Sequence, residues 1–335
     1  MSRSETTADW QPACARSALI ARAELNARIR RFFAERGVLE VETPQLSRRT
    51  GTDPNLQPFL THFHRPGEAS AEGQPLYLQT SPEFAMKRLL AAGSGSIYQI
   101  CKAYRNEECG RQHNPEFTIL EWYRVGFGLT ELMDEVEDLL TDLARPTLKL
   151  GASERLPYRA IFAEHVGADP LSASLEELAV CAETHGIEDA RRLCGSERSC
   201  WLDLLFSLLV QPRLGEERIS FVYDYPALLP SLARHKPGEP DVVERVEVFL
   251  AGVELGNGFH ELSDPLEQER RFDADLAIRR AQGPNEPEKD ERLLGALRAG
   301  LPDCCGIALG LDRILMLITG AESLDAVLAF PLERA

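Results

Sequence analysis

The sequence predicts an α+β fold in which helices flank an antiparallel sheet. Long segments with helical periodicity lie at both ends and in the middle of the chain, and the strand segments between them are short and joined by tight turns. Strands that follow one another in this way pair antiparallel, unlike strands that alternate regularly with helices. Neither a P-loop nor a GxGxxG turn is present, so the familiar phosphate-binding motifs of parallel sheets are absent.

The composition is that of an acidic globular protein. With 44% hydrophobic and 27% charged residues among 335, the chain can bury a large core. Its net charge of −16 counts against a nucleic-acid partner, because binding to phosphates needs basic patches. Eight cysteines without a CxxC pair, and the absence of a secretory or membrane-spanning segment, predict a cytoplasmic protein with no membrane association.

The N-terminal third is expected to begin with a long helix. Apolar side chains recur at helical spacing over residues 16–36, and Gly37 is placed to end that helix. Alternation over 38–43 predicts a strand that Pro44 terminates. Further along, the sequence predicts a polar loop over 61–74, an extended segment over 76–80, a helix over 82–92 and two strands over 98–104 and 116–123.

The middle of the chain, residues 130–211, is expected to be mostly helical. A hairpin that turns near Ala251 and Gly252 should follow, because two β-rich segments flank that pair. The expected helices are 132–143, 175–184, 201–210 and 265–282, the expected strands are 221–225, 242–250 and 253–259, and the chain should end as helix, strand, helix.

Two polar segments carry arginines suited to a polyphosphate. Arg105, at the end of a predicted strand, offers a bidentate fork to an α-phosphate, and Phe117 on the returning strand offers a stacking face for a base. In the second segment, glycines between Gly306 and Gly310 would allow close approach of a ligand, and Arg313 opens the next helix. Each feature alone is also typical of an ordinary loop, so their combination carries the argument.

Three glutamates, Glu247, Glu254 and Glu261, are evenly spaced near the predicted hairpin. If the hairpin turns at residues 250–251, Glu247 and Glu254 lie opposite each other on neighbouring strands. Opposed like charges are destabilising unless something neutralises them. A magnesium ion is the natural candidate, because hard carboxylate and phosphate oxygens are its usual ligands.

In this order the segments resemble the motifs of class II aminoacyl-tRNA synthetases, above all those of lysyl-tRNA synthetase. The resemblance implies one class II catalytic domain over 1–335, with 145–218 as a mostly helical insertion and no anticodon-binding domain. The first helix and strand resemble the motif that forms the dimer interface in that family, so a homodimer is expected. The likeness is carried by Thr80-Ser-Pro-Glu83, Arg105-Asn-Glu107, His113-Asn-Pro-Glu-Phe117, Asp224-Tyr-Pro226 and Asn257-Gly-Phe-His-Glu261.

The resemblance also implies a role for each matching residue. A lysine-like substrate has two ammonium groups and one carboxylate, so its pocket needs several acids around one arginine. ATP would be bound by Arg105, Asn106, Glu107, His113, Asn114, Phe117, Glu254, Leu255, Gly310 and Arg313, with Arg105 and Arg313 catalytic. The amino acid would be bound by Ser81, Pro82, Glu83, Tyr123, Asn257, Phe259, Glu261 and Ala308, and magnesium by Glu247 and Glu254.

Three features depart from lysyl-tRNA synthetase. About fifteen residues precede the first helix, too few for the anticodon-reading barrel, Ala308 stands where that enzyme has glycine, and Arg111 lies one residue early. These features resemble the elongation factor P–(R)-β-lysine ligases, truncated relatives of lysyl-tRNA synthetase. That family implies ATP-dependent activation of (R)-β-lysine or lysine and transfer to the ε-amino group of a lysine on elongation factor P, without tRNA.

Three other functions are compatible with the same fold. A regulatory, non-catalytic relative would be expected to lose the phosphate-binding arginines or the metal carboxylates, yet Arg105, Arg313, Glu247 and Glu254 are all present. A stand-alone asparagine synthetase fits poorly, because an acid-rich pocket favours a cationic side chain. A truncated synthetase that charges tRNA stays open. His260, beside Glu261, is expected to have a packing or hydrogen-bonding role.

Overall fold

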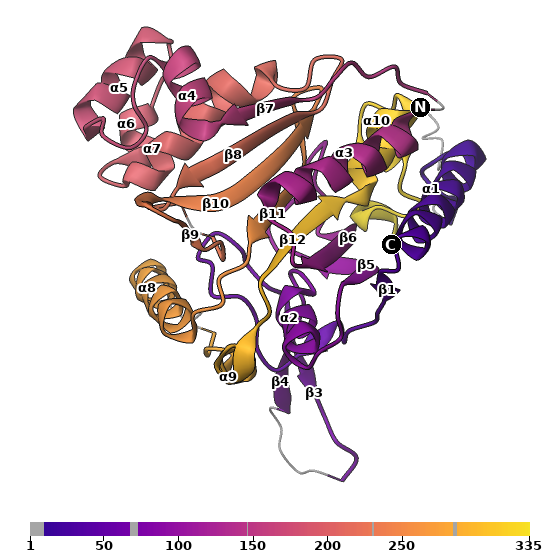
Figure 1. The fold of residues 1–335 in the computed structure, drawn as a ribbon. Helices are drawn as coiled ribbons and strands as arrows, with labels where there is room; N and C mark the ends of the chain where they lie inside the picture. Colours follow the sequence, from indigo (N-terminus) through magenta and orange to yellow (C-terminus); the bar gives the residue numbers. More distant parts are fainter. Residues whose placement is uncertain (1–9, 68–72, 146, 230, 284–286) are drawn as a thin grey trace, which may run out of the picture. The chain divides into compact units, whose positions relative to one another are not determined.

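The computed structural model describes residues 10–67, 73–145, 147–229, 231–283 and 287–335 (Figure 1). The chain divides into two compact units. The first unit is built from Met1–Glu121, Pro265–Leu301 and Gly310–Ala335, and the second from Trp122–Asp264 and Pro302–Leu309. The chain passes between the units within strand β6 (Glu116–Val125) and at the end of strand β12 (Cys304–Gly310).

The first unit begins with helix α1 (Arg16–Glu35), as the sequence predicted. Its buried face includes Leu25, Ile29 and Phe33, which recur at helical spacing, and Gly37 follows with a φ of +65° that favours glycine. Helix α1 packs beside α10 (Leu311–Thr319) (Figure 1). The N- and C-terminal helices of the chain are thus neighbours in this unit.

The strands of the first unit are shorter than expected at its start. Only two residues form β1 (Leu39–Glu40), which pairs in parallel with β5 (Ile97–Tyr104), and β6 continues from β5 through a polar loop. The loop expected over 61–74 is wrong at both ends, because β3 (Leu60–Phe63) and β4 (Gln74–Leu78) form a three-stranded sheet with β2 (Leu46–Ser47); residues 68–72 lie outside the described ranges. The remaining helices of this unit are α2 (Glu83–Ala91), α8 (Pro265–Gln282) and α9 (Glu291–Gly300).

The sheet of the second unit has the strand order β12-β11-β10-β8-β7, with β9 (His235–Lys236) paired to β10. Neighbouring strands run antiparallel except β7 (Glu154–Pro157) and β8 (Ser220–Pro226), which are parallel. The long pair β10 (Glu239–Leu250) and β11 (Val253–His260) turns at Ala251 and Gly252, which confirms the predicted hairpin. Both turn residues have positive φ, +53° and +74°.

Helices complete the second unit. Helix α3 (Leu129–Ala144) follows β6, and α4 to α7 gather into one group (Figure 1). Aromatic side chains fill the core between this group and β8, where the ring of Tyr158 stacks on Phe206 with 5.0 Å between centroids. The helix expected over 201–210 begins earlier and ends in a π-turn over Phe206–Val210. The helices of the group are α4 (Tyr158–Val166), α5 (Leu175–Thr184), α6 (Ala190–Cys194) and α7 (Arg198–Leu205).

The described helices include none that is both long enough and apolar enough to cross a bilayer.

All eight cysteines are free thiols. Burial, together with the nearby Glu121 carboxylate, raises the pKa of the Cys101 thiol to about 12. Buried thiols of this kind behave as small apolar core residues.

Candidate functional site

The loop between β5 and β6, in the first unit, brings together the first pair of predicted nucleotide-binding residues. Arg105 follows β5 directly, and its backbone N–H donates to the carbonyl of Pro115 at 2.9 Å. The guanidinium lies 5.1 Å from the centre of the Phe117 ring, and its Nη1 lies 3.3 Å from Oε1 of Glu108. The guanidinium of Arg105 and the aromatic ring of Phe117 therefore lie close together.

The second predicted arginine lies close to the same loop. Arg313, in the first turn of α10, places Nη2 2.8 Å from Nε2 of His113 and donates from Nε to the carbonyl of Gln112 at 3.2 Å. Burial lowers the pKa of His113, and the positive charges of Arg313 and Arg105 lower it further. Both arginines thus favour the neutral form of the His113 imidazole. In that form Nε2 can accept a hydrogen bond from the Arg313 guanidinium.

Four further residues expected at the nucleotide belong to the first unit as well, whereas the other two, Glu254 and Leu255, lie on β11 in the second unit. Glu107 is exposed and has a left-handed φ of +69°, and Asn114 donates from Nδ2 to the carbonyl of Glu116 at 2.6 Å. Arg111 donates instead to the carbonyl of Glu322 at 3.1 Å, so its side chain is engaged by the C-terminal segment. Asn106 lies in the loop between Arg105 and Glu107, and Gly310 is the N-cap of α10.

A hydrogen-bonded group at the start of α2 contains three residues predicted to bind the amino acid. Ser81 donates from Oγ to Oε2 of Glu121 at 2.7 Å and accepts from the backbone N–H of Glu83 at 3.1 Å, while Pro82 is the N-cap. Glu83 is paired with the buried Lys87, whose Nζ lies 2.6 Å from Oε1. Sequence reasoning missed this lysine, because a buried lysine one turn along a helix has no distinctive pattern.

In the second unit, one face of strands β10, β11 and β12 gathers most of the remaining predicted residues. Asn257 pairs with Ala308 on one side and Glu247 on the other, and Phe259 pairs with Gly306. Residues directly opposite in an antiparallel pair share a face, and so do alternate residues along a strand. Asn257, Phe259, Glu247 and Ala308 therefore share one face of the sheet.

Gly306 allows two buried residues, Tyr123 and Glu261, to meet on this face. A Cβ atom placed on Gly306 would lie 2.3 Å from Cε1 of Tyr123 and 2.6 Å from Oε1 of Glu261. Both side chains would have to move to accommodate a methyl group. A carboxylate and a phenol at one point are suited to an ammonium group. The sequence did not reveal the role of Gly306, because it depends on the register of β12 against β11.

The expected arrangement of Glu247 and Glu254 is wrong in detail. Glu247 lies opposite Asn257, and Glu254 lies opposite Phe249, because a bulge leaves Leu255 without a partner position on β10. Phe249 is two residues from Glu247 on the same strand, so both glutamates still share a face. The two acids are diagonal neighbours and not a directly opposed pair.

Two residues to which the sequence assigned no role hold Glu247 in place; one of them, Tyr225, belongs to the quoted Asp224-Tyr-Pro226 motif. The Tyr225 hydroxyl donates to Oε2 of Glu247 at 2.7 Å, and Arg245 forms an ion pair with Oε1. Arg245 also donates from Nε to Oδ1 of Asn257 at 3.1 Å. Burial, and then the Glu247 carboxylate, hold the pKa of Tyr225 well above its ordinary value. The only signal in the sequence was the alternation along β10, which places Arg245 on the same face as Glu247, two residues later.

The described ranges contain no cluster of three or more histidine, cysteine, aspartate or glutamate side chains with the geometry of a metal site. Magnesium, however, commonly uses one or two protein carboxylates and takes its other ligands from substrate phosphates and water. Glu247 and Glu254, on one face of the sheet, fit that smaller donor set.

Known proteins resemble the chain over nearly its whole length. Residues 3–334 match the family described as tRNA synthetases class II (D, K and N). The chain is 50% identical over 330 residues to the elongation factor P–(R)-beta-lysine ligase of Vibrio cholerae serotype O1, covering 98% of this chain and 100% of that protein. The ligases of Yersinia enterocolitica and Salmonella paratyphi B are 50% and 49% identical over 332 residues, each covering 98% of this chain and 99% of the relative. The chain therefore belongs to the class II tRNA synthetase family.

Proposed function

We propose that the chain is an ATP-dependent ligase that joins (R)-β-lysine, or lysine, to the ε-amino group of a lysine on elongation factor P. The observation that carries the proposal is the meeting of Tyr123 and the buried Glu261 carboxylate at Gly306. This arrangement suits the ammonium group of a lysine-like side chain. Relatives 50% identical over the chain are named for the same activity, which supports elongation factor P as the acceptor.

The reaction would take place in two steps. The substrate carboxylate attacks the α-phosphorus of ATP, so that a new O–P bond forms and the bond to pyrophosphate breaks, while Arg105 and Arg313 stabilise the developing negative charge. The acceptor amine then attacks the carbonyl carbon, forms the amide and releases AMP and a proton. Magnesium held by Glu247 and Glu254 would supply positive charge to the polyphosphate. A protein nucleophile is unnecessary, because the mixed anhydride is already activated.

Pyrophosphate exchange with a panel of (R)-β-lysine, lysine and aspartate tests the first step. Exchange with (R)-β-lysine or lysine but not aspartate is expected, because the pocket is rich in acids. Transfer of a radiolabel to elongation factor P, and to no tRNA, tests the second step. Exchange with none of the three would favour a regulatory protein, and label on tRNA alone would favour a truncated tRNA synthetase.

The proposal extends to assembly and location. A homodimer formed through α1 and β1 is supported by the resemblance of this segment to the dimer motif of class II synthetases. Sedimentation of the purified chain should give twice its mass of 37.3 kDa. A cytoplasmic location is supported by the eight free thiols, which suit a reducing compartment.

A further inference from the structure

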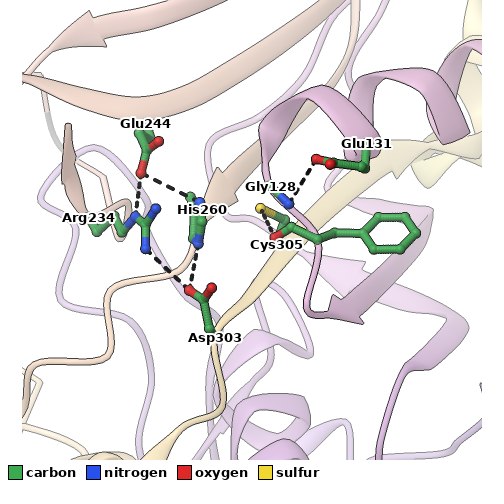
Figure 2. A network of polar contacts seen from close by, with 8 residues as sticks. Gly128, Glu131, Arg234, Glu244, His260, Asp303 and Cys305 are labelled. Atoms are coloured by element: carbon green, nitrogen blue, oxygen red, sulfur yellow. Dashed lines mark hydrogen bonds and ion pairs between the residues drawn. The ribbon is translucent and has the colours of Figure 1, made fainter. Parts of the chain in front are cut away.

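Four ionisable side chains of the second unit form a network of polar contacts (Figure 2). His260 is 4% exposed; its Nε2 lies 2.7 Å from Oδ1 of Asp303 and its Nδ1 lies 3.5 Å from Oε2 of Glu244. Arg234 connects the two acids, with Nη1 3.2 Å from the same Asp303 oxygen and Nε hydrogen-bonded to Glu244. We call these four residues the His260 network. The proposed reaction assigns none of them a part.

The His260 network lies on the opposite side of the backbone from the Glu261 carboxylate, which is proposed to bind the ammonium group. His260 and Glu261 are consecutive residues at the end of β11, and consecutive residues of an extended chain point to opposite sides. The backbone is held here as well, because the N–H of Glu261 donates to the carbonyl of Cys304 at 3.0 Å and that of Arg234 to the carbonyl of His260 at 2.9 Å. The side chain of His260 and the backbone of Glu261 are thus fixed by adjoining residues.

The segment that contains Asp303 also holds the turn that follows Tyr123. The carbonyl of Asp303 accepts from the N–H of Gly126 at 2.8 Å, and the thiol of Cys305 donates to the carbonyl of Phe127 at 3.1 Å. This turn comes directly after β6, which carries Tyr123. Residues 303–305 therefore connect the two strands that bring Tyr123 and Glu261 to Gly306.

Local hydrogen bonds hold the turn itself. The N–H of Gly128 donates to Oε2 of Glu131 at 3.1 Å, which caps the start of α3 beside Cys305 (Figure 2). A capped helix start restrains the backbone that precedes it. A displacement of Asp303 would consequently shift both Tyr123 and Glu261, and not only one of them.

We infer that the His260 network is a positioning device that fixes Glu261 relative to Tyr123 and so sets the affinity for the ammonium-bearing substrate. Hydrogen bonds between a carboxylate and an ammonium depend strongly on geometry, and small displacements at a reacting or binding group cause large losses. The inference rests on the proposed function. The four residues act through Glu261 and are positioning residues, not catalytic ones.

Asp303 allows positioning to be separated from folding. Its side chain is 70% exposed, and exposed ion pairs contribute little to stability. The test compares Asp303→Ala, which removes the acceptor of His260, with Asp303→Asn, which keeps an acceptor oxygen. The matched control is Asp134→Ala on α3, which removes an aspartate that is 62% exposed and paired with Arg155.

The readout is the KM for (R)-β-lysine and for ATP in pyrophosphate exchange. Asp303→Ala should raise the KM for (R)-β-lysine about tenfold and change the KM for ATP by less than about twofold. Asp303→Asn should recover most of the loss, and Asp134→Ala should match the wild type. If Asp303→Ala changed both KM values equally, or changed neither, the inference would be overturned. The proposed function would still stand in that case, provided that the wild-type protein catalyses the exchange.

His260 supplies a second test should Asp303→Ala fail to fold. His260→Gln keeps a side-chain donor for Asp303, whereas His260→Leu removes it. The KM for (R)-β-lysine should lie closer to the wild type in His260→Gln than in His260→Leu. Equal KM values in these two variants would exclude a positioning role. Absence of exchange by the wild-type protein itself would instead refute the proposed function.

Discussion

At the scale of single residues, the acids proposed to serve the reaction are held in place by their neighbours. Glu83 is paired with the buried Lys87, and Glu247 receives a hydrogen bond from Tyr225 and an ion pair from Arg245. Charged groups fixed in this way need little rearrangement when a ligand arrives. Changes to the residues that support these acids should therefore have effects as clear as changes to the acids.

Gly306→Ala should weaken binding of the amino acid specifically. The new methyl group would lie 2.3 Å from Tyr123 and 2.6 Å from Glu261, so the ring or the carboxylate must shift. We expect the KM for (R)-β-lysine to rise about tenfold or more, and the KM for ATP to change by less than about twofold, in pyrophosphate exchange. The control is Gly295→Ala in α9, where a Cβ meets nothing within 4 Å. A normal KM in Gly306→Ala would show that Tyr123 and Glu261 do not form the pocket.

Arg245→Met should destabilise the protein strongly. Loss of this mostly buried guanidinium leaves the Glu247 carboxylate without its ion pair, which for a buried pair costs roughly 3 kcal/mol or more. The control is Arg191→Met, because Arg191 is 51% exposed and its ion pairs with Glu176 and Glu183 are screened by water and should contribute little to stability. Urea unfolding followed by tryptophan fluorescence measures both. Equal losses would mean that the Arg245 pair is not shielded from water.

His113 should titrate below its ordinary pKa of 6.5, because burial and the two arginines disfavour its charged form. The sign follows from linkage: its contribution to stability is complete above pH 6.5 and is lost as the pH falls through the lower, folded-state pKa. An NMR titration of the imidazole protons should give this midpoint. In Arg313→Gln the midpoint should rise only in part, since burial is the larger cause. A wild-type midpoint at or above 6.5 would contradict this account.

At the scale of helices and strands, periodicity predicted most elements and failed where the pairing is irregular. Helix α1, helix α5 and the turn of the β10–β11 hairpin agree with expectation, because each has a clear apolar period or turn residues. The register of that hairpin differs from the expected one, which placed Glu247 opposite Glu254. Both faces of β10 are buried near the turn, so alternation is lost, and nothing in the sequence marks the bulge at Leu255.

The pairing of β11 with β12 also bears on substrate choice. Ala308 lies opposite Asn257 on the face proposed to bind the amino acid. Ala308→Gly should shift the ratio of kcat/KM for (R)-β-lysine and lysine toward lysine by about tenfold, since one methyl group in a pocket contributes roughly 1–3 kcal/mol. Ile307→Val, on the opposite face of β12, is the control and should leave the ratio unchanged. An unchanged ratio in Ala308→Gly would remove this residue from the selectivity.

At the scale of the whole molecule, the sequence predicted family and fold class better than the contacts of the site. Resemblance extends over residues 3–334, so the order of elements follows from the family. The residues that support the acids were missed for a physical reason. Arg245 and Gly306 matter because of the side chains that surround them in the sheet, and these depend on packing and register that one sequence does not encode locally. Lys87 lies one helical turn from Glu83, so the spacing of this pair is local, but the burial of the lysine depends on tertiary packing.

The charge of the whole chain predicts which acceptor the activated amino acid reaches. The affinity of a protein for RNA phosphates comes mainly from basic side chains, yet this chain has 37 basic residues and 53 acidic ones. Label from (R)-β-lysine or lysine should therefore reach elongation factor P in the presence of excess tRNA, and added tRNA should leave pyrophosphate exchange unchanged. The assay should be run at about 50 mM and about 200 mM salt, because phosphate contacts weaken steeply over this range. Transfer to tRNA at low salt that disappears at high salt would reveal a local basic surface that the net charge conceals.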